Sequence, residues 1–143
     1  MKELLKEYKV ISTIKVQWGD MDAMQHVNNV AYVRWGEIAR IEYFIALGVF
    51  SSEPEQIKFA PILGFQSVKY ISPVVYPDTI RIGTKTEEIK ADRIVLKSFY
   101  YSENQQQLIA IKIQEVIPFD YKTQIKIPVP KELILKINNL EGL

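Results

Sequence analysis

The sequence lacks cysteine altogether and has a single histidine among its 143 residues. Without cysteine there is no disulfide, no thiolate metal ligand and no thiol nucleophile. One histidine, His26, excludes a multi-histidine zinc site. A charge excess is also missing, because 18 basic and 17 acidic residues give a net charge of +1. Nucleic-acid-binding proteins usually carry a clear basic excess, so we expect no nucleic-acid partner.

Long apolar runs are absent as well, and no stretch approaches the roughly 18 residues of a membrane-spanning helix. Glu3 and Glu7 follow the first lysine, and no apolar run of signal-peptide length appears. We therefore expect a cytoplasmic protein with no membrane partner. The length suits a single domain, residues 1–143, with a hydrophobic core of its own.

The alternation of apolar residues predicts one strand, one long helix and then four or five further strands. Residues 10–18 form the first strand, because Val10, Ser12, Ile14, Val16 and Trp18 would share one face. The later strands are predicted at residues 65–72, 79–87, 94–101, 108–117 and 124–129, and a short helix at residues 131–137 after Pro130. Short connections favour antiparallel pairing. This order indicates an α+β fold in which an antiparallel sheet covers one apolar helix.

The long helix is predicted over residues 30–47. Asparagine before a helix is a favoured N-cap, and Gly48 suits the C-terminal cap. The apolar stripe is wide and consists of Ala31, Trp35, Ile38, Ile41 and Ile45, flanked by Tyr32, Ala39, Phe44 and Leu47. Gly36 lies at mid-helix, where glycine costs about 1 kcal/mol. We attribute it to the close approach of another backbone.

The segment from Trp18 to Asn29 joins the first strand to this helix and is dense in polar residues. It contains Asp20, Asp22, His26 and two asparagines. A helix N-terminus offers unpaired N–H groups and a partial positive charge, which can hold a developing oxyanion. A nearby carboxylate can act as base or nucleophile. These are components for acyl transfer or hydrolysis, although many loops carry two aspartates.

Three blocks of residues also carry a family resemblance. The first is Trp18-Gly19-Asp20-Met21-Asp22, then His26-Val27-Asn28-Asn29, then Tyr32, Trp35, Glu37, Ala39 and Arg40. The others, less specific, are Val68-Lys69-Tyr70 with Pro73 and Tyr76-Pro77-Asp78, and Asp120 with residues 127–128. Together they resemble the 4-hydroxybenzoyl-CoA thioesterase family of hotdog-fold proteins. The resemblance implies a long helix wrapped by a five- or six-stranded antiparallel sheet. It also implies a homodimer or homotetramer with active sites between subunits, and hydrolysis of acyl-CoA thioesters without a cofactor.

The resemblance also implies roles for individual residues. Asp22 would be the catalytic carboxylate, and the backbone N–H aligned with Asn29 would polarise the thioester carbonyl. His26 is weighed from its own chemistry and its place before the helix, and would either position substrate or water or hold the loop in shape. Gln25 stands where the family usually has glycine, so it would either alter the loop or contact the substrate.

Three residues keep more ordinary alternatives. Asn28 is a substrate-binding candidate but suits a helix cap better. Glu37 is a second candidate for the carboxylate or for substrate binding, and a local ion pair with Arg40 is its ordinary role. Asp20 is expected to form the turn or to pair with a basic side chain.

Other functions remain open at this point. The chain could be a non-catalytic hotdog module that binds acyl-CoA or an acyl carrier. A hydratase or dehydratase would need a histidine and a carboxylate across the pocket. Five basic residues would either contact CoA phosphates or lie at solvated strand edges: Arg81, Lys85, Lys90, Arg93 and Lys97. Residues 49–60 could form one wall of the pocket.

Overall fold

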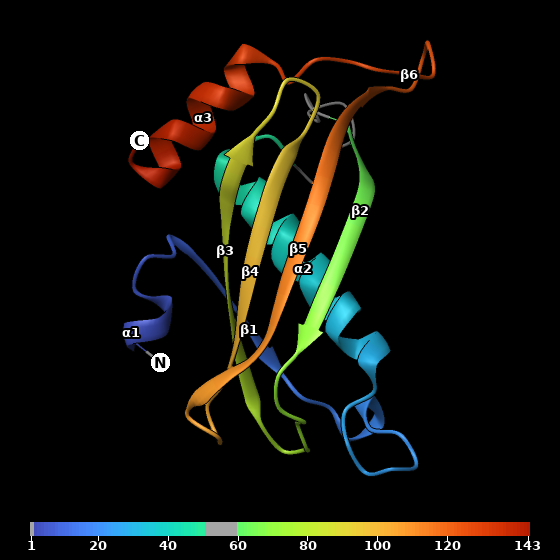
Figure 1. The fold of residues 1–143 in the computed structure, drawn as a ribbon, viewed down its shortest axis with the longest axis vertical. Coiled ribbons are helices and arrows are strands. Elements are labelled where there is room, and N and C mark those ends of the chain that lie inside the picture. Colours follow the sequence, from blue (N-terminus) through green and yellow to red (C-terminus); the bar gives the residue numbers. More distant parts are fainter. Residues whose placement is uncertain (1, 51–59) are drawn as a thin grey trace.

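The computed structural model describes residues 2–50 and 60–143. An antiparallel six-stranded sheet carries one long helix across one of its faces (Figure 1). The elements in chain order are α1 (Lys2–Leu5), β1 (Val10–Lys15), η1 (Trp18–Asp20), α2 (Asn29–Leu47), β2 (Pro61–Tyr70), β3 (Thr79–Ile89), β4 (Ile94–Ser102), β5 (Gln107–Asp120), β6 (Ile125–Lys126) and α3 (Lys131–Glu141). The strand order is β1-β3-β4-β5-β2, and β6 pairs with the end of β5. The predicted α+β class is confirmed.

Several predicted boundaries were wrong. β1 ends at Lys15 instead of residue 18, because the chain turns into η1, a short 3-10 helix. There the Asp20 carboxylate accepts the Gln17 backbone N–H at 2.8 Å, which stabilises the turn. β2 begins at Pro61 and ends at Tyr70, and the strand predicted at residues 124–129 shortens to β6. Local turn bonds of this kind cannot be read from apolar alternation.

The caps of α2 agree with the prediction, and its buried face does not. The Asn28 side chain accepts the Val30 N–H at 3.0 Å, and Gly48 ends the helix in the left-handed conformation. Ile38 and Ile45, both in the predicted stripe, are 39% and 55% exposed. The buried residues are Ala31, Tyr32, Trp35, Gly36, Ala39, Tyr43, Phe44 and Leu47. The helix is apolar around most of its circumference, so the sheet's position decides which side it covers.

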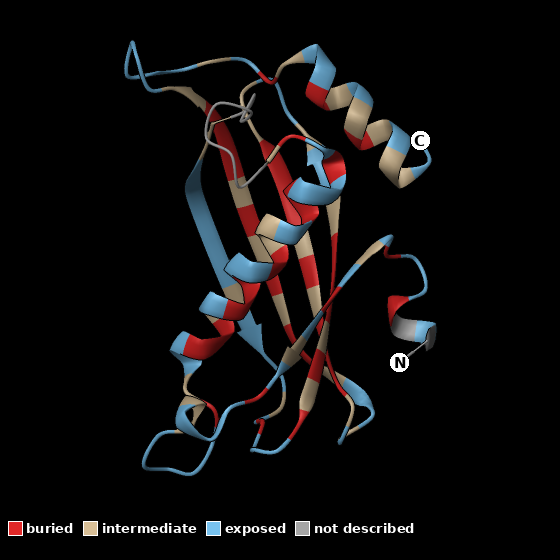
Figure 2. Cartoon of the chain, turned by 180° about the vertical axis from the view of Figure 1, so that it is seen from behind, coloured by how far each residue is buried: buried red, intermediate tan, exposed pale blue. Residues whose placement is uncertain are grey.

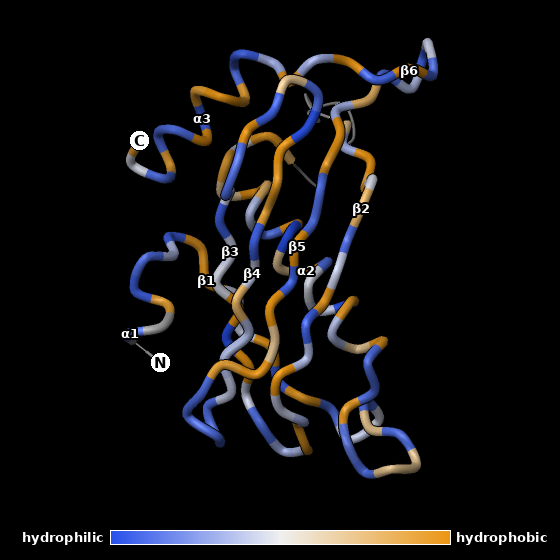
Figure 3. Tube along the Cα trace, in the orientation of Figure 1, coloured by the Kyte–Doolittle hydropathy of each residue, from blue (hydrophilic) through white to orange (hydrophobic). Residues whose placement is uncertain are grey.

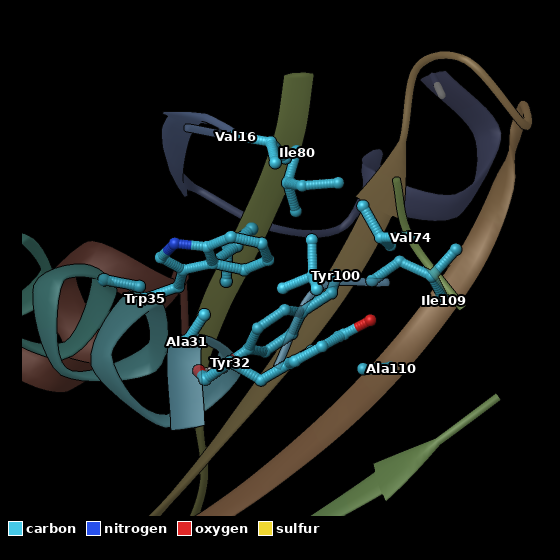
Figure 4. Close-up of a cluster of buried hydrophobic side chains, with 12 residues drawn as sticks. Val16, Ala31, Tyr32, Trp35, Val74, Ile80, Tyr100, Ile109 and Ala110 are labelled. Atoms are coloured by element: carbon cyan, nitrogen blue, oxygen red, sulfur yellow. Dashed lines mark hydrogen bonds between the residues drawn. The ribbon is translucent and has the colours of Figure 1, made fainter. Parts of the chain in front are cut away.

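Two groups of side chains form the core beneath α2. Around its first half lie Tyr32 and Trp35 with Ile80 and Tyr100 from the sheet (Figure 4). Around its second half, Tyr43 and Phe44 meet the apolar face of α3, a helix in which hydrophobic and hydrophilic residues alternate visibly (Figure 3). No helix in residues 2–50 and 60–143 is long and apolar enough to cross a membrane.

β2 forms an edge of the main sheet. It pairs with β5 on one side only, and its residues are exposed or half-buried along the whole strand (Figure 2). The exposed apolar side chains on it are Ile62, Leu63, Phe65 and Tyr70. An exposed apolar edge strand is a surface on which another strand can pair.

Gly36 does admit a close approach, but the prediction of another backbone was wrong. A Cβ at this position would lie 2.5 Å from the Tyr100 hydroxyl oxygen and 2.6 Å from Cδ and Nζ of Lys112. Real Cβ atoms do not come this close to other heavy atoms, so the space beside Gly36 belongs to two side chains of the sheet.

Candidate active site

Residues 18–28, here called the site loop, fold back on themselves before α2 begins. Met21 and Val27 form an isolated antiparallel bridge. Inside that bridge the Asp22 N–H donates to the His26 carbonyl at 3.0 Å, and the Gln25 N–H donates to the Asp22 carbonyl at 2.9 Å. The loop is therefore a closed hairpin-like turn that places Asp22 opposite His26.

The site loop is also anchored at its end. The Val27 N–H donates to the Val74 carbonyl at 2.8 Å, in the connection between β2 and β3, and the Asn28 N–H donates to the Asp20 carbonyl at 2.8 Å. These bonds hold the start of α2 against the turn. Sequence-distant segments thereby fix the relative position of the loop and the helix.

Gln25 has a positive φ of 63°, in the left-handed region. Glycine takes this conformation most easily, and an L-residue pays for it with backbone strain. The departure from the family's usual glycine therefore leaves the turn in a glycine-type conformation. The Gln25 side chain lines a pocket of about 590 Å³ together with Asp22.

Asp22 is exposed and only partly used by the loop. Its Oδ1 accepts the Met24 N–H at 2.9 Å, while its Oδ2 meets no donor among the residues that the structure describes. The other residues of its pocket present polar and apolar surface in similar amounts and are Trp18, Met21, Ala23, Gln25, Val75 and Tyr76. The result is a carboxylate that lines a pocket of mixed polarity and has one oxygen without a donor among the described residues.

Both carboxylate oxygens of Asp20, two residues earlier, have partners. One oxygen caps the Gln17 N–H at 2.8 Å, and the other lies 3.4 Å from Nη2 of Arg34. Its side chain is 11% exposed. Both ordinary roles expected for Asp20, turn former and partner of a basic side chain, are present.

The start of α2 offers one backbone donor. The Val30 N–H is taken by the Asn28 side chain and the Ala31 N–H by the Asn28 carbonyl at 2.9 Å. The Asn29 N–H meets no acceptor within residues 2–50 and 60–143. Asn29 lines a second pocket of about 290 Å³, whose other residues are Val27, Tyr32, Tyr70, Ile71, Ser72 and Pro73.

Most of the candidate residues lie where the site loop meets the start of α2, but they do not line one common pocket. Asp22 and Asn29 line different pockets, and residues 71–76 contribute walls to both. The exposed imidazole of His26 makes no hydrogen bond within the described part of the chain. Asn28 spends its side-chain oxygen on the helix cap.

Glu37 lies apart from the junction. It is eight residues after Asn29 on α2, or about 12 Å along the helix axis. Its carboxylate is 3.7 Å from Nη2 of Arg40, and its side chain is 59% exposed. This is the local ion pair expected as its ordinary role.

Four of the five basic residues considered for CoA phosphates already have carboxylate partners. The pairs are Arg81–Glu103 at 2.8 Å, Lys85–Glu7 at 3.0 Å, Arg93–Glu115 at 2.7 Å and Lys97–Glu87 at 3.8 Å. Of the wall predicted from residues 49–60, residues 51–59 lie outside the described residues. Within the ranges that are described, no three His, Asp or Glu side chains gather as metal ligands would.

Tyr70 and Tyr76 were named from the sequence only as part of the family resemblance and were given no place in the site, and Tyr100 and Lys112 were not singled out. A usable signal existed for Lys112, because a lysine interrupts the strongly apolar run of β5. Lys112 is fully buried, and burial, together with the nearby Arg40, lowers its pKa from 10.5 to about 8. Burial raises the pKa of Tyr32 to about 12 and that of Tyr100 further, so both phenols stay neutral at ordinary pH.

Known thioesterases resemble this chain in sequence and in fold. The long-chain acyl-CoA thioesterase FadM of Escherichia coli K12 is 26% identical over 131 residues, which cover 89% of this chain and 96% of FadM. A thioesterase from Thermus thermophilus, solved with coenzyme A and zinc, has a TM-score of 0.84 at 20% identity, covering 96% of this chain and 98% of its own. The DHNA-CoA thioesterase of Staphylococcus aureus has a TM-score of 0.79 at 23% identity, covering 93% and 94%.

These two structural likenesses support the hotdog fold that the residue blocks suggested. The profile of the thioesterase-like superfamily matches residues 16–137, which include the site loop, α2 and every strand of the sheet except β1. The chain therefore belongs to the thioesterase-like superfamily and is, by that membership, a thioester hydrolase.

Proposed function

We propose that the chain hydrolyses acyl-CoA thioesters at the junction of the site loop and α2. One observation carries this proposal: Asp22 has an unused carboxylate oxygen in a loop held against a helix start, where the Asn29 N–H meets no acceptor among the described residues. A carboxylate and an anion-binding helix terminus suit acyl transfer. The name of the relative FadM supports CoA as the thiol.

In the proposed reaction the thioester carbonyl bridges the two pockets, with its oxygen toward the Asn29 N–H. Asp22 attacks the carbonyl carbon to form an acyl–aspartyl anhydride and release the CoA thiolate, and water then hydrolyses the anhydride. Alternatively, Asp22 takes a proton from the water that attacks. Both routes convert a thioester and water into an acid and a thiol. The N–H and the positive end of α2 stabilise the oxyanion.

The test is thiol release from a panel of short, medium, long and aromatic acyl-CoAs. The wild-type protein is expected to cleave at least one of them. Asp22→Asn keeps the shape of the side chain but removes the base or nucleophile, so kcat should fall by about 1,000-fold. If no panel member is cleaved, the proposal is wrong, and binding without turnover would favour the non-catalytic hotdog module.

Asp20→Asn is the matched control, because it makes the same chemical change two residues away. Its carboxylate is occupied by Gln17 and Arg34. The variant should therefore lose some thermal stability and keep kcat within about 10-fold of the wild type. Equal losses in the two variants would show that the assignment of Asp22 rests on loop structure alone.

We also propose that the chain works as a homodimer or homotetramer. The open edge of β2 supports this, since it exposes Phe65 and Tyr70 by 50% and 47%. A second copy would cover these side chains and pair the free strand edge. Light scattering should give a mass two or four times 16.6 kDa, and a monomeric mass would contradict the proposal.

A further inference from the structure

Two buried side chains of the sheet donate hydrogen bonds to backbone carbonyls near the start of α2. The Tyr100 hydroxyl of β4 donates to the Tyr32 carbonyl at 2.7 Å. The Lys112 ammonium of β5 donates to the Val33 carbonyl at 3.2 Å. A carbonyl oxygen has two lone pairs, so each can take this bond beside a helical one. The sheet thereby holds two successive peptide groups of the helix.

A third donor acts at Asn29 itself. The Tyr70 hydroxyl of β2 donates to the Asn29 carbonyl at 3.3 Å, in an exposed position. The rings support this arrangement, because Tyr32 lies edge-on to Tyr70 at 5.0 Å and stacks on Tyr100 at 6.1 Å between ring centroids. The first turns of α2 are thus tied to three different strands.

Burying the side chain of Lys112 at this position is energetically unfavourable. Its residue is 0% exposed, and Arg40 on α2 is a second nearby cation. Glu37, the carboxylate of this cluster, is largely in solvent. Methionine would fill similar space without burying a charge, and such replacements are often neutral or stabilising. The bond to the helix backbone is what distinguishes the lysine from an apolar side chain.

Gly36 lies at the same contact and lowers the stability of the helix. A helix interior loses about 1 kcal/mol with glycine in place of alanine. Here a Cβ would lie 2.5 Å from the Tyr100 hydroxyl and 2.6 Å from the Lys112 amine. Only glycine leaves both donors within reach of the helix backbone. Two unfavourable residues therefore meet where the sheet holds α2, seven residues after Asn29.

We propose that Tyr100 and Lys112 are positioning residues for the oxyanion donor at Asn29. They fix the axial position and the rotation of the first turns of α2, so that the N–H keeps its place as negative charge develops on the substrate oxygen. This inference rests on the proposed function. A shift of about 1 Å in a reacting group can cost about 100-fold in rate, so a loosened helix should be visible in kcat.

The test compares Tyr100→Phe, Lys112→Met and the double variant with Tyr101→Phe. Tyr101 is the matched control, since it is 1% exposed, donates to Gln106 at 3.0 Å and packs with Leu5 and Tyr8, away from α2. Each single α2-facing variant should lower kcat by about 10-fold and leave KM within about 2-fold. Tyr101→Phe should keep kcat. A kcat loss that follows thermal stability in all variants, Tyr101→Phe included, would overturn the proposal.

Gly36→Ala provides a second test, because its methyl group displaces both donors at once. It should lower kcat about as much as the double variant. Added to the double variant, it should lower kcat less than it does in the wild type, since both donors are already gone and only the contact with the side chain at position 112 remains. Full additivity would contradict the proposal.

A readout independent of activity separates this inference from the proposed function. Hydrogen exchange in a peptide covering residues 29–36 should be faster in the double variant than in the wild type or Tyr101→Phe. If kcat and exchange are unchanged while Asp22→Asn is inactive, the positioning role is wrong and the proposed function stands. If the wild type cleaves no thioester, the proposed function has failed and the exchange result alone decides whether the sheet holds α2.

Discussion

The exposed site loop and the buried polar side chains in and beside the sheet use their hydrogen-bonding groups in opposite ways. In the site loop, Asp22 keeps one carboxylate oxygen without a donor from the described residues. Directly before β3, Asp78 is 8% exposed and accepts from the Ser102 hydroxyl, the Thr79 N–H and the Asn104 N–H. Water can satisfy an exposed group, whereas a buried one needs a protein partner. An exposed carboxylate oxygen without a protein donor is therefore available for chemistry, whereas a buried carboxylate with all its donors stabilises the fold.

Most buried polar groups have a protein partner, with a few exceptions. In the described part of the chain, Nε2 of Gln114, Oγ of Ser12 and Oη of Tyr8 are buried without a hydrogen-bond partner. Each such group costs about 1–3 kcal/mol. Gln114 does accept from Arg40 through its oxygen, so only half of its amide is used. The difference between buried and exposed polar groups can be tested by removing a carboxylate of each kind.

Removing the Asp78 carboxylate should have the largest effect on stability. Asp78→Ala leaves the Ser102 hydroxyl and two backbone N–H groups without an acceptor, which should cost about 3 kcal/mol and lower Tm by about 10 °C. Asp22→Ala, which frees only one exposed N–H, should change Tm by about 2 °C or less. Thermal unfolding followed by circular dichroism measures both. Similar losses in the two variants would break the comparison.

The charge of Lys112 should make stability depend on pH in alkaline solution. Its pKa is about 8 in the folded chain and 10.5 ordinarily, so the unfolded chain binds more protons between these values. Stability should therefore rise with pH through this window, by about 2 kcal/mol from pH 8 to 9.5. The groups facing the amine are Arg40 and Glu37 from α2 and Tyr100 from β4.

Lys112→Met is the control for this pH dependence, because other titrating groups cancel in the difference between the two proteins. Urea unfolding at about pH 7.5 and about pH 9.5, on either side of the lowered pKa, should show a gain for the wild type relative to the variant. Parallel stability curves would mean that Lys112 has an ordinary pKa in the folded chain.

Relaxing the site loop should have the smallest effect. Gln25→Gly removes the strain of a left-handed residue and should stabilise by about 0.5 kcal/mol, after the entropy of glycine in the unfolded chain is subtracted. Gln124→Gly is the matched control, with a φ of 60° and a side chain that donates to the Tyr121 carbonyl at 2.7 Å. It should gain less, because that bond is lost. A lower stability for Gln25→Gly would mean that its side chain supports the turn.

Much of the fold could be predicted because its signals are local. Asn28 and Gly48 mark the ends of α2 by their own capping chemistry, and the alternation in β3, β4 and β5 reports one buried and one less buried face. The site loop was found from its polar density and its family resemblance. The placement of Asp22 and Asn29 in two pockets could not be predicted, because each pocket is completed by residues far away in sequence, 71–73 in one and 75–76 in the other.

By itself, the sequence determined the long helix, the succession of strands along the chain, the caps and the polar segment before α2, since each depends on neighbouring residues. The place of β2 beside β5 at the sheet edge departs from the expected meander of consecutive strands and was decided by the tertiary structure. The tertiary structure alone decided which side of α2 is buried, because an apolar helix has several sides that burial would favour. It also showed that Asp20 has both expected partners, a local turn bond from Gln17 and an ion pair with Arg34, while Asp22 keeps an oxygen without a donor among the described residues. Two carboxylates of identical chemistry differ in their roles because α2 brings Arg34 to one of them and no described donor reaches the second oxygen of the other.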